Sequence, residues 1–234
     1  MLTCEAINTF YGPAHVLFDV DVKVGEGDMV CLIGRNGVGK STCLKSIMGI
    51  APVTTGRIRL DGTEISALPP YRIARAGIGY VPEDRRVFAD LTVEENLEVA
   101  ERHDGPWNRK AVYELFPALQ EFRARHGGLL SGGQQQMLTI ARTLVGNPRL
   151  LLIDEPTEGL SPLVVRTLED MIRGLKAKGQ TMLLAAQDLR FSLSVADVIY
   201  VLDRGRVAYC GDRAQASADI ERIRPILSVS ASRQ

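Results

Sequence analysis

One short segment constrains the fold of this chain more than any other feature of its sequence. Residues 34–41 read Gly-Arg-Asn-Gly-Val-Gly-Lys-Ser and match the pattern G-x-x-x-x-G-K-[ST] at every fixed position. The apolar run Met29–Ile33 precedes this segment, and a helical pattern, Ser41–Gly49, follows it. Glycines let the backbone curl so that successive N–H groups point at one anion, aided by the N-terminus of the following helix. The sequence therefore predicts a strand, a phosphate-binding loop and a helix, in that order.

The side chains at the end of this loop have separate chemical roles in the prediction. Lys40 would place a positive charge at the β- and γ-phosphates of a nucleotide, and Ser41 would offer a hydroxyl to Mg²⁺. A glycine-rich turn that only starts a helix would not require Lys-Ser in this register. The residues predicted to contact the phosphates are Gly34, Arg35, Asn36, Gly37, Val38, Gly39, Lys40, Ser41 and Thr42.

A second apolar run, Leu150–Ile153, ends at two acids. Asp154 would deliver a carboxylate to the metal at the carboxyl edge of a strand. Glu155, the next residue, could accept a proton from an attacking water. Together with the Lys40 loop, this run predicts that the chain binds a nucleoside triphosphate with magnesium and hydrolyses it.

The predicted strands show two kinds of apolar pattern. Val20–Val24 and Arg57–Leu60 alternate apolar and polar residues, which is typical of half-buried strands in a small antiparallel sheet. The runs Met29–Ile33, Leu150–Ile153 and Met182–Ala186 do not alternate, which indicates strands buried on both faces of a parallel sheet. The fold class predicted from these patterns is α/β.

Helical patterns lie between and after these strands. The clearest is Pro162–Lys178, with Ser161 as a candidate N-cap. The region 84–145 is more helical than its surroundings, and Thr92 with Glu95 matches a capping box within it. We interpret this region as a helical insertion in the α/β core, because an ordinary crossover is too short to account for so many residues.

The segment Leu130-Ser131-Gly132-Gly133-Gln134 precedes another helical pattern, Gln135–Val145. Its serine and glycine amides at a helix N-terminus form a second anion site. With this segment in place, the sequence resembles the ABC-type ATPases over nearly its whole length. The resemblance implies a P-loop NTPase (RecA-like) core with an N-terminal antiparallel β subdomain and a helical signature subdomain. It implies one nucleotide-binding domain, 1–234, with the helical subdomain at about 84–145 and a polar tail at 228–234.

The resemblance also implies how two subunits share ATP. The signature of one subunit, which comprises Ser131, Gly132, Gly133 and Gln134, closes on the ATP held by the phosphate loop of another. Two sites then form in a head-to-tail sandwich. Tyr11 falls where an aromatic side chain of the family stacks on adenine.

Two positions depart from the common pattern of the family. Glu83 stands where most members carry Gln, and its carboxylate could ligate Mg²⁺ or orient water. Gln187 stands where most members carry a switch His. The histidines, which are His15, His103 and His126, all precede Asp154, so none of them can take that place. Gln187 can donate a hydrogen bond to the γ-phosphate but cannot become cationic.

Four segments, at 80–88, 91–97, 131–137 and 154–160, resemble one subgroup of the family. It is the second ATPase subunit of branched-chain amino-acid importers, with relatives in amide and urea uptake. The resemblance implies a cytoplasmic subunit, peripheral on the inner face of the membrane. Its implied partners are integral membrane permease subunits, a second ATPase subunit of the same or a homologous kind, and indirectly a periplasmic or surface binding protein. Val87 and Phe88 are candidate permease contacts.

Composition narrows the alternatives. The chain has 28 Lys and Arg against 28 Asp and Glu, and a formal net charge of zero argues against a non-specific nucleic-acid binder. Scattered cysteines fit a reducing compartment, and Cys43, beside the phosphate loop, is a candidate for alkylation. Two alternatives stay open: a soluble ABC-type ATPase acting on DNA or ribosomes, and an ATP-binding switch with little hydrolysis.

Overall fold

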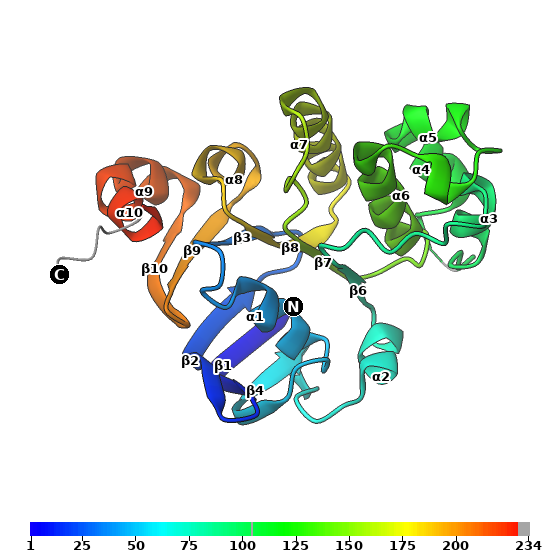
Figure 1. Ribbon diagram of the computed structural model, residues 1–234. Helices are drawn as coiled ribbons and strands as arrows, with labels where there is room; N and C mark the ends of the chain where they lie inside the picture. The colour runs from blue at the N-terminus through cyan, green and yellow to red at the C-terminus, as the bar shows by residue number, and fades with distance from the viewer. Residues whose placement is uncertain (104, 229–234) are drawn as a thin grey trace.

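The structure, a computed structural model of the chain, describes residues 1–103 and 105–228 (Figure 1). Most of the predicted polar tail, residues 229–234, lies outside the described residues. The strands are β1 (Leu2–Tyr11), β2 (Ala14–Val24), β3 (Met29–Ile33), β4 (Val53–Leu60), β5 (Thr63–Glu64), β6 (Ile78–Val81), β7 (Leu150–Asp154), β8 (Thr181–Ala186), β9 (Val198–Asp203) and β10 (Arg206–Asp212). The helices are α1 (Lys40–Ile47), α2 (Pro70–Arg75), α3 (Val93–Glu98), α4 (Arg109–Leu115), α5 (Pro117–Glu121), the 3-10 turn η1 (Gly127–Leu129), α6 (Gly132–Leu144), α7 (Pro162–Ala177), α8 (Leu189–Val195), α9 (Arg213–Ala218) and α10 (Ile220–Leu227).

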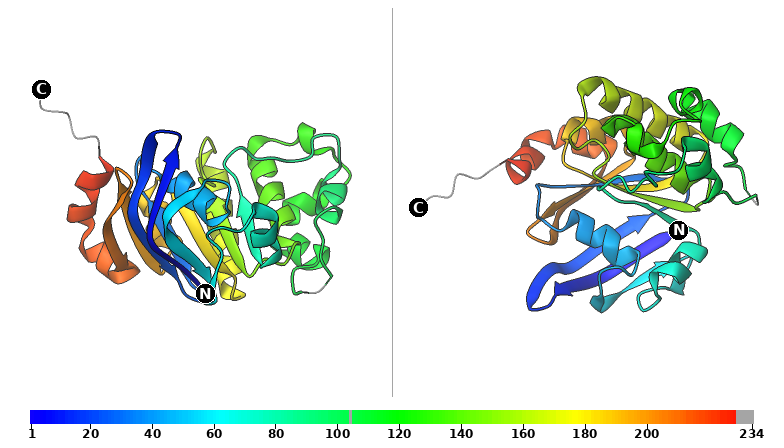
Figure 2. Two further views of the ribbon diagram at one scale, coloured as in Figure 1. Left: turned by 90° about the horizontal axis from the view of Figure 1, so that it is seen from below. Right: turned by 45° about the vertical axis from the view of Figure 1, so that its right-hand side comes forward.

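The strands form two sheets. The N-terminal sheet is antiparallel, in the order β2-β1-β4-β5. The second sheet has the order β10-β9-β3-β8-β7-β6, in which only the edge strand β10 runs antiparallel to its neighbour. Helices α6 to α10 lie over one face of this second sheet, and α1 lies between the two sheets (Figures 1 and 2). The predicted α/β architecture is confirmed.

The strand β3 explains why its sequence does not alternate. Met29, Cys31 and Ile33 belong to the hydrophobic core under the helices, and Val30 and Leu32 belong to the core between the two sheets. Successive side chains of a strand point to opposite faces, so a strand covered on both faces is apolar throughout. The phosphate loop is therefore attached to a strand that is fixed from both sides.

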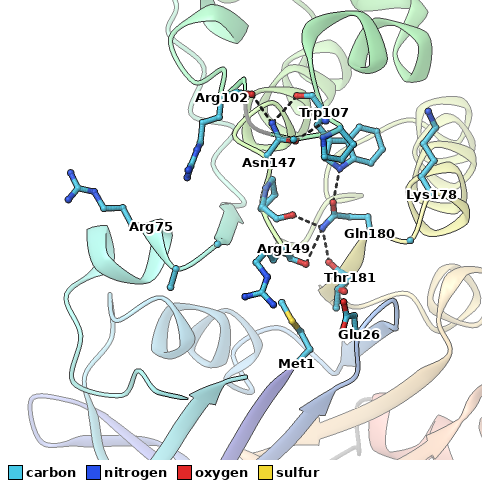
Figure 3. Close-up of a pocket in the computed structure, with 16 residues that line it drawn as sticks. Met1, Glu26, Arg75, Arg102, Trp107, Asn147, Arg149, Lys178, Gln180 and Thr181 are labelled. Carbon is cyan, nitrogen blue, oxygen red and sulfur yellow. Dashed lines mark hydrogen bonds between the residues drawn. The ribbon is translucent and has the colours of Figure 1, made fainter. Parts of the chain in front are cut away.

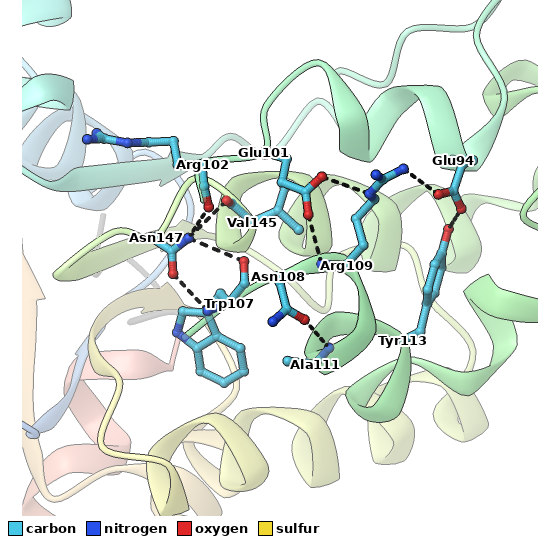
Figure 4. A network of polar contacts seen from close by, with 10 residues as sticks. All are labelled: Glu94, Glu101, Arg102, Trp107, Asn108, Arg109, Ala111, Tyr113, Val145 and Asn147. Atoms are coloured by element: carbon cyan, nitrogen blue, oxygen red, sulfur yellow. Dashed lines mark hydrogen bonds and ion pairs between the residues drawn. The ribbon is translucent and has the colours of Figure 1, made fainter. Parts of the chain in front are cut away.

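The chain between β6 and β7 carries α3, α4, α5, η1 and α6. Figure 4 shows how polar side chains join α3 to α4. Glu94 of α3 accepts hydrogen bonds from Arg109 Nη1, at 2.6 Å, and from the Tyr113 hydroxyl. The predicted capping box of α3 is present, with Thr92 and Glu95 satisfying each other's backbone N–H groups. These contacts hold α3 and α4 together beside α6.

Ser161 takes its predicted position at the N-cap of α7 but does not cap the helix with its side chain. Pro162 at the first helical position has no N–H to satisfy and has φ preset for a helix, so this end needs less capping. The start of α7 therefore depends on Pro162 rather than on the serine hydroxyl.

The structure overturns the prediction for Cys43. The side chain is fully buried in the first turn of α1, and burial together with the nearby Asp154 charge raises the pKa of its thiol to about 12. A helix start lowers a thiol pKa only where the thiolate is solvated, and here desolvation prevails. Cys43 is therefore an unreactive core residue.

The free energy of unfolding is expected to depend on three buried thiols at alkaline pH. Burial raises the pKa of Cys4, and raises those of Cys31 and Cys43 to about 12, so the unfolded chain loses these protons first. The thiol contribution is complete below about pH 8.5, and the free energy of unfolding falls as pH rises toward 12. The expected slope is about 1.4 kcal/mol per pH unit for each thiol. Urea unfolding between pH 8 and 10 measures it; Cys43→Ala should have a shallower slope, and an equal slope would contradict the assignment.

Candidate functional site

The phosphate loop joins β3 to α1, and its backbone requires glycine at two positions. Gly37 and Gly39 have φ of 79° and 109°, in the left-handed region that glycine tolerates best. A Cβ on Gly39 would lie 2.8 Å from Leu17 Cδ2, and one on Gly34 would lie 2.5 Å from the Leu202 carbonyl oxygen. The loop therefore fits closely against strands of both sheets, and this fit explains the glycines at 34 and 39.

Lys40 is the first residue of α1, and its side chain reaches back to the loop. Its Nζ donates to the carbonyl oxygens of Gly34 and Arg35, at 2.8 and 2.9 Å, and forms an ion pair with Glu155 Oε1 at 2.8 Å. The two charged side chains are 4% and 7% exposed, so water screens the pair little. A phosphate that arrives at Lys40 has to compete with Glu155 for the ammonium group.

Asp154 lies at the end of β7, beside α1 and β6. Its Oδ1 accepts a hydrogen bond from Ser41 Oγ at 2.9 Å, and its Oδ2 accepts one from the Tyr80 hydroxyl at 3.0 Å. Burial raises the pKa of Asp154, and these two hydrogen bonds oppose the shift. Burial also raises the pKa of Glu155, with the hydrogen bond and charge of Lys40 opposing. Burial therefore disfavours the charged form of both carboxyl groups, and hydrogen-bond donors favour it.

The side-chain oxygens of Ser41 and Asp154 are suitable ligands for Mg²⁺. Among the described residues there is no cluster of three or more His, Cys, Asp or Glu side chains that could hold a metal. Mg²⁺ is usually bound through one or two protein oxygens together with substrate phosphates, so no such cluster is needed. The Ser41 hydroxyl and the Asp154 carboxylate meet that requirement.

A cavity of about 280 Å³ opens over the loop. It is lined by Val16, Asn36, Gly37, Gly39, Lys40, Ser41, Thr42, Glu83, Glu155 and Glu158. Most of the predicted loop residues and two of the three predicted acids, Glu83 and Glu155, thus share one cavity, whereas Asp154 does not line it. The other predicted loop residues, Gly34, Arg35 and Val38, do not line it. No role was predicted for Val16 or for Glu158, although Glu158 lies within the segment 154–160.

Gln187 follows β8 and lines an adjoining cavity of about 410 Å³ together with Glu155 and Glu158. The remaining lining residues are Thr157, Gly159 and Asp188. The Glu155 N–H donates to the Ala185 carbonyl at 2.9 Å, which fixes β8 beside the acid. The structure therefore places Gln187 and Glu155 around one cavity, which adjoins the phosphate cavity at Glu155 and Glu158.

The signature residues and Tyr11 lie outside both cavities. Ser131 is the N-cap of α6, and its side chain and that of Gln134 form a capping box. Tyr11 ends β1 and is 46% exposed, and it does not line the phosphate cavity. One chain therefore holds the phosphate loop and the acids in one place and the second anion site in another.

A larger pocket of about 480 Å³ lies at the opposite, amino-terminal ends of β7 and β8 (Figure 3). Its floor is a polar network in which Trp107 Nε1 donates to Gln180 Oε1 at 2.9 Å, and Gln180 Nε2 donates to the Pro148 carbonyl at 3.0 Å. Arg75 and Arg149 line its rim. The pocket contains none of the residues predicted for phosphate binding, so its size does not identify the functional site.

Comparison with known proteins decides the family. Residues 17–158, which hold the phosphate loop, the acids and the signature, match the model of the family described as ABC transporter. The chain belongs to the ABC transporter family.

Two relatives of this ABC chain carry informative names. It is 43% identical over 211 residues to the high-affinity branched-chain amino acid transport ATP-binding protein BraG of Pseudomonas aeruginosa, covering 88% of this chain and 91% of the relative. It is 41% identical over 216 residues to a probable branched-chain amino acid transport ATP-binding protein, LivF, of Archaeoglobus fulgidus, covering 90% and 92%.

Solved ABC cassettes have the same fold. A nucleotide-free ATP-binding cassette from an ABC transporter superposes with a TM-score of 0.84 at 26% identity, over 98% of this chain and 99% of the other. A bacterial ABC transporter cassette described as dimeric gives a TM-score of 0.79 at 25% identity, over 91% and 99%. In the described part of this chain, no helix is both long enough and apolar enough to cross a membrane.

Proposed function

We propose that this chain is the ATP-hydrolysing subunit of a membrane importer for branched-chain amino acids. The observation that supports the substrate class most strongly is the 43% identity to BraG over nearly the whole of both chains. Two such relatives from distant organisms carry the same substrate in their names. Small amides are the alternative cargo, because the same subgroup resemblance extends to amide and urea uptake.

The proposed chemistry uses the residues of the phosphate cavity. The loop amides and Lys40 bind the β- and γ-phosphates, and Glu155 accepts a proton from the attacking water. Mg²⁺ would be held by Ser41 and Asp154, with Glu83 nearby, and would neutralise charge on the phosphates. Gln187 donates a hydrogen bond to the γ-phosphate region without adding a charge. The distance of 2.8 Å between Lys40 Nζ and Glu155 Oε1 supports these roles, because it places the proposed base beside the proposed phosphate ligand.

The proposed assembly is a head-to-tail pair of ATPase subunits on permease subunits. The separation of the signature tip from the phosphate cavity within one chain supports it, because each half of a site then needs a second subunit. Each subunit would be one nucleotide-binding domain whose helical subdomain, 84–145, carries the signature. We place the assembly on the cytoplasmic face of the membrane, with a binding protein supplying the cargo on the other side and no nucleic acid involved. Adenine would stack on Tyr11, whose exposed ring is free to receive it.

The exposure of Phe88 and the hydrogen bonds to its backbone support its proposed contact with a permease. Its ring is 47% exposed, with the Arg142 guanidinium 4.5 Å from the ring centroid. Fully buried Asn96 fixes the backbone of the same residue: Nδ2 donates to the Phe88 carbonyl at 3.0 Å, and Oδ1 accepts from the Phe88 N–H at 2.9 Å. An exposed ring on a fixed backbone is suited to receive a partner side chain.

Purification from native membranes tests the proposal. We expect tagged wild-type protein to bring down permease chains, and Phe88→Glu to reduce their recovery at least several-fold, since a buried charge opposes apolar contact. Leu129→Glu, another exposed apolar residue, is the matched control. Cells that lack this chain should lose leucine uptake and retain acetamide uptake. That result would assign branched-chain amino acids as the cargo. Recovery of the wild-type chain without any permease would contradict the proposal.

A further inference from the structure

Arg85 joins three segments that are distant in sequence. Its Nη2 donates to the Glu158 carbonyl oxygen at 2.5 Å. A Cβ placed on Gly132 would lie 2.5 Å from Arg85 Nη1, and one on Gly159 would lie 3.6 Å from Nη2. The guanidinium group therefore lies between the first residue of α6 and the segment that follows Glu155.

Two of these segments form walls of the phosphate cavity. Glu83, two residues before Arg85, and Glu158, whose carbonyl Arg85 binds, both line that cavity. The Arg85 backbone has φ of 47°, in a region that few residues other than glycine adopt, so its surroundings hold it there. Arg85 thus connects the two walls through its backbone and its guanidinium group.

The third segment is the start of the signature helix. Arg85 forms no ion pair within the part of the chain that the structure describes, and its charge lies beside the positive end of the α6 dipole. A cation in that position is unfavourable alone and becomes favourable when an anion arrives. Arg85 therefore adds positive charge at the tip that carries Ser131.

We infer that Arg85 is a positioning residue for ATP-dependent closure, linking the walls of a subunit's own phosphate cavity to the signature tip that meets the neighbour's ATP. The inference rests on the proposed function, in which that tip closes on a second subunit. It also gives Gly132 a role within its own chain, because a side chain there would displace the Arg85 guanidinium.

ATP-dependent dimerisation of the full chain tests this inference. In a Glu155→Gln background, light scattering is measured against ATP concentration for Arg85→Ala and for the matched control Arg86→Ala, which removes an exposed arginine paired with Asp84. We expect Arg85→Ala to need about tenfold more ATP, equivalent to about 1.4 kcal/mol, and Arg85→Lys to fall between. Binding of a fluorescent ADP to the single subunit should not change. If both alanine variants dimerise alike, the inference is wrong.

A double-mutant cycle gives an independent result. Gly132→Ala should impair dimerisation strongly in the parent protein and at least threefold less in the Arg85→Ala protein, because the guanidinium that the new methyl displaces is already absent. An equal loss of dimerisation in the two backgrounds would show that the effect of Gly132→Ala does not depend on Arg85. If the Glu155→Gln parent itself does not dimerise with ATP, the pairing of two copies of this chain fails, and the inference fails with it.

Discussion

Glu155→Gln is expected to lower the rate of ATP hydrolysis by about 10²- to 10⁴-fold, the usual contribution of a general base. The amide is nearly the same size but cannot accept a proton from water. ATP affinity should not fall, because the change also removes the carboxylate that pairs with Lys40 at 2.8 Å. Phosphate release and nucleotide binding, measured on the same preparations, separate the two effects.

Glu158→Gln is the matched control for this experiment. Glu158 lines the same cavity, but its side chain is exposed and pairs with no cation within the described residues. Its change should alter the rate by less than about tenfold, since it removes only a solvent-exposed charge. Equal rates for wild type and Glu155→Gln would remove the proposed base. A wild-type protein with almost no hydrolysis would instead favour the ATP-binding switch.

The strand, loop and helix at residues 29–47 were predictable because their sequence signal is local. The loop glycines, Lys40 and Ser41 are consecutive, and the strand before them is apolar on both faces, so one segment contains the whole signal. Asp154 was also predictable, because the carboxyl ends of parallel strands meet at one edge of a sheet. Family membership confirms the ABC resemblance that the signature motif carried.

Contacts between distant segments were not predictable. No pattern places Tyr80 on Asp154; the pairing comes from the register of β6 beside β7, where Tyr80 lies opposite Leu152. The Arg85 contact with the Glu158 carbonyl likewise depends on a left-handed backbone and on two loops meeting. The Cys43 prediction failed for a related reason, because a helix start was visible in the sequence and the burial of the thiol was not.

Lys40→Ala is expected to weaken Mg-ATP binding by about 10- to 150-fold, because charge-assisted hydrogen bonds of about 1.5–3 kcal/mol are lost. The free protein should also lose stability. Without Lys40, the nearly buried Glu155 carboxylate has no cation, and removal of one member of a buried pair costs about 3–5 kcal/mol. Nucleotide titration and urea unfolding at neutral pH measure the two losses.

The double variant Lys40→Ala with Glu155→Gln separates these losses. The amide needs no counter-charge, so most of the stability should return, while nucleotide binding should remain weak because the phosphates still lack Lys40. If stability and binding recover together, weak binding in the single variant reflects unfolding, and Lys40 is not a phosphate ligand. If binding alone stays low, the ion pair of the free protein is a contact that the nucleotide replaces, and phosphate binding then releases Glu155 to act as a base only when its substrate is present.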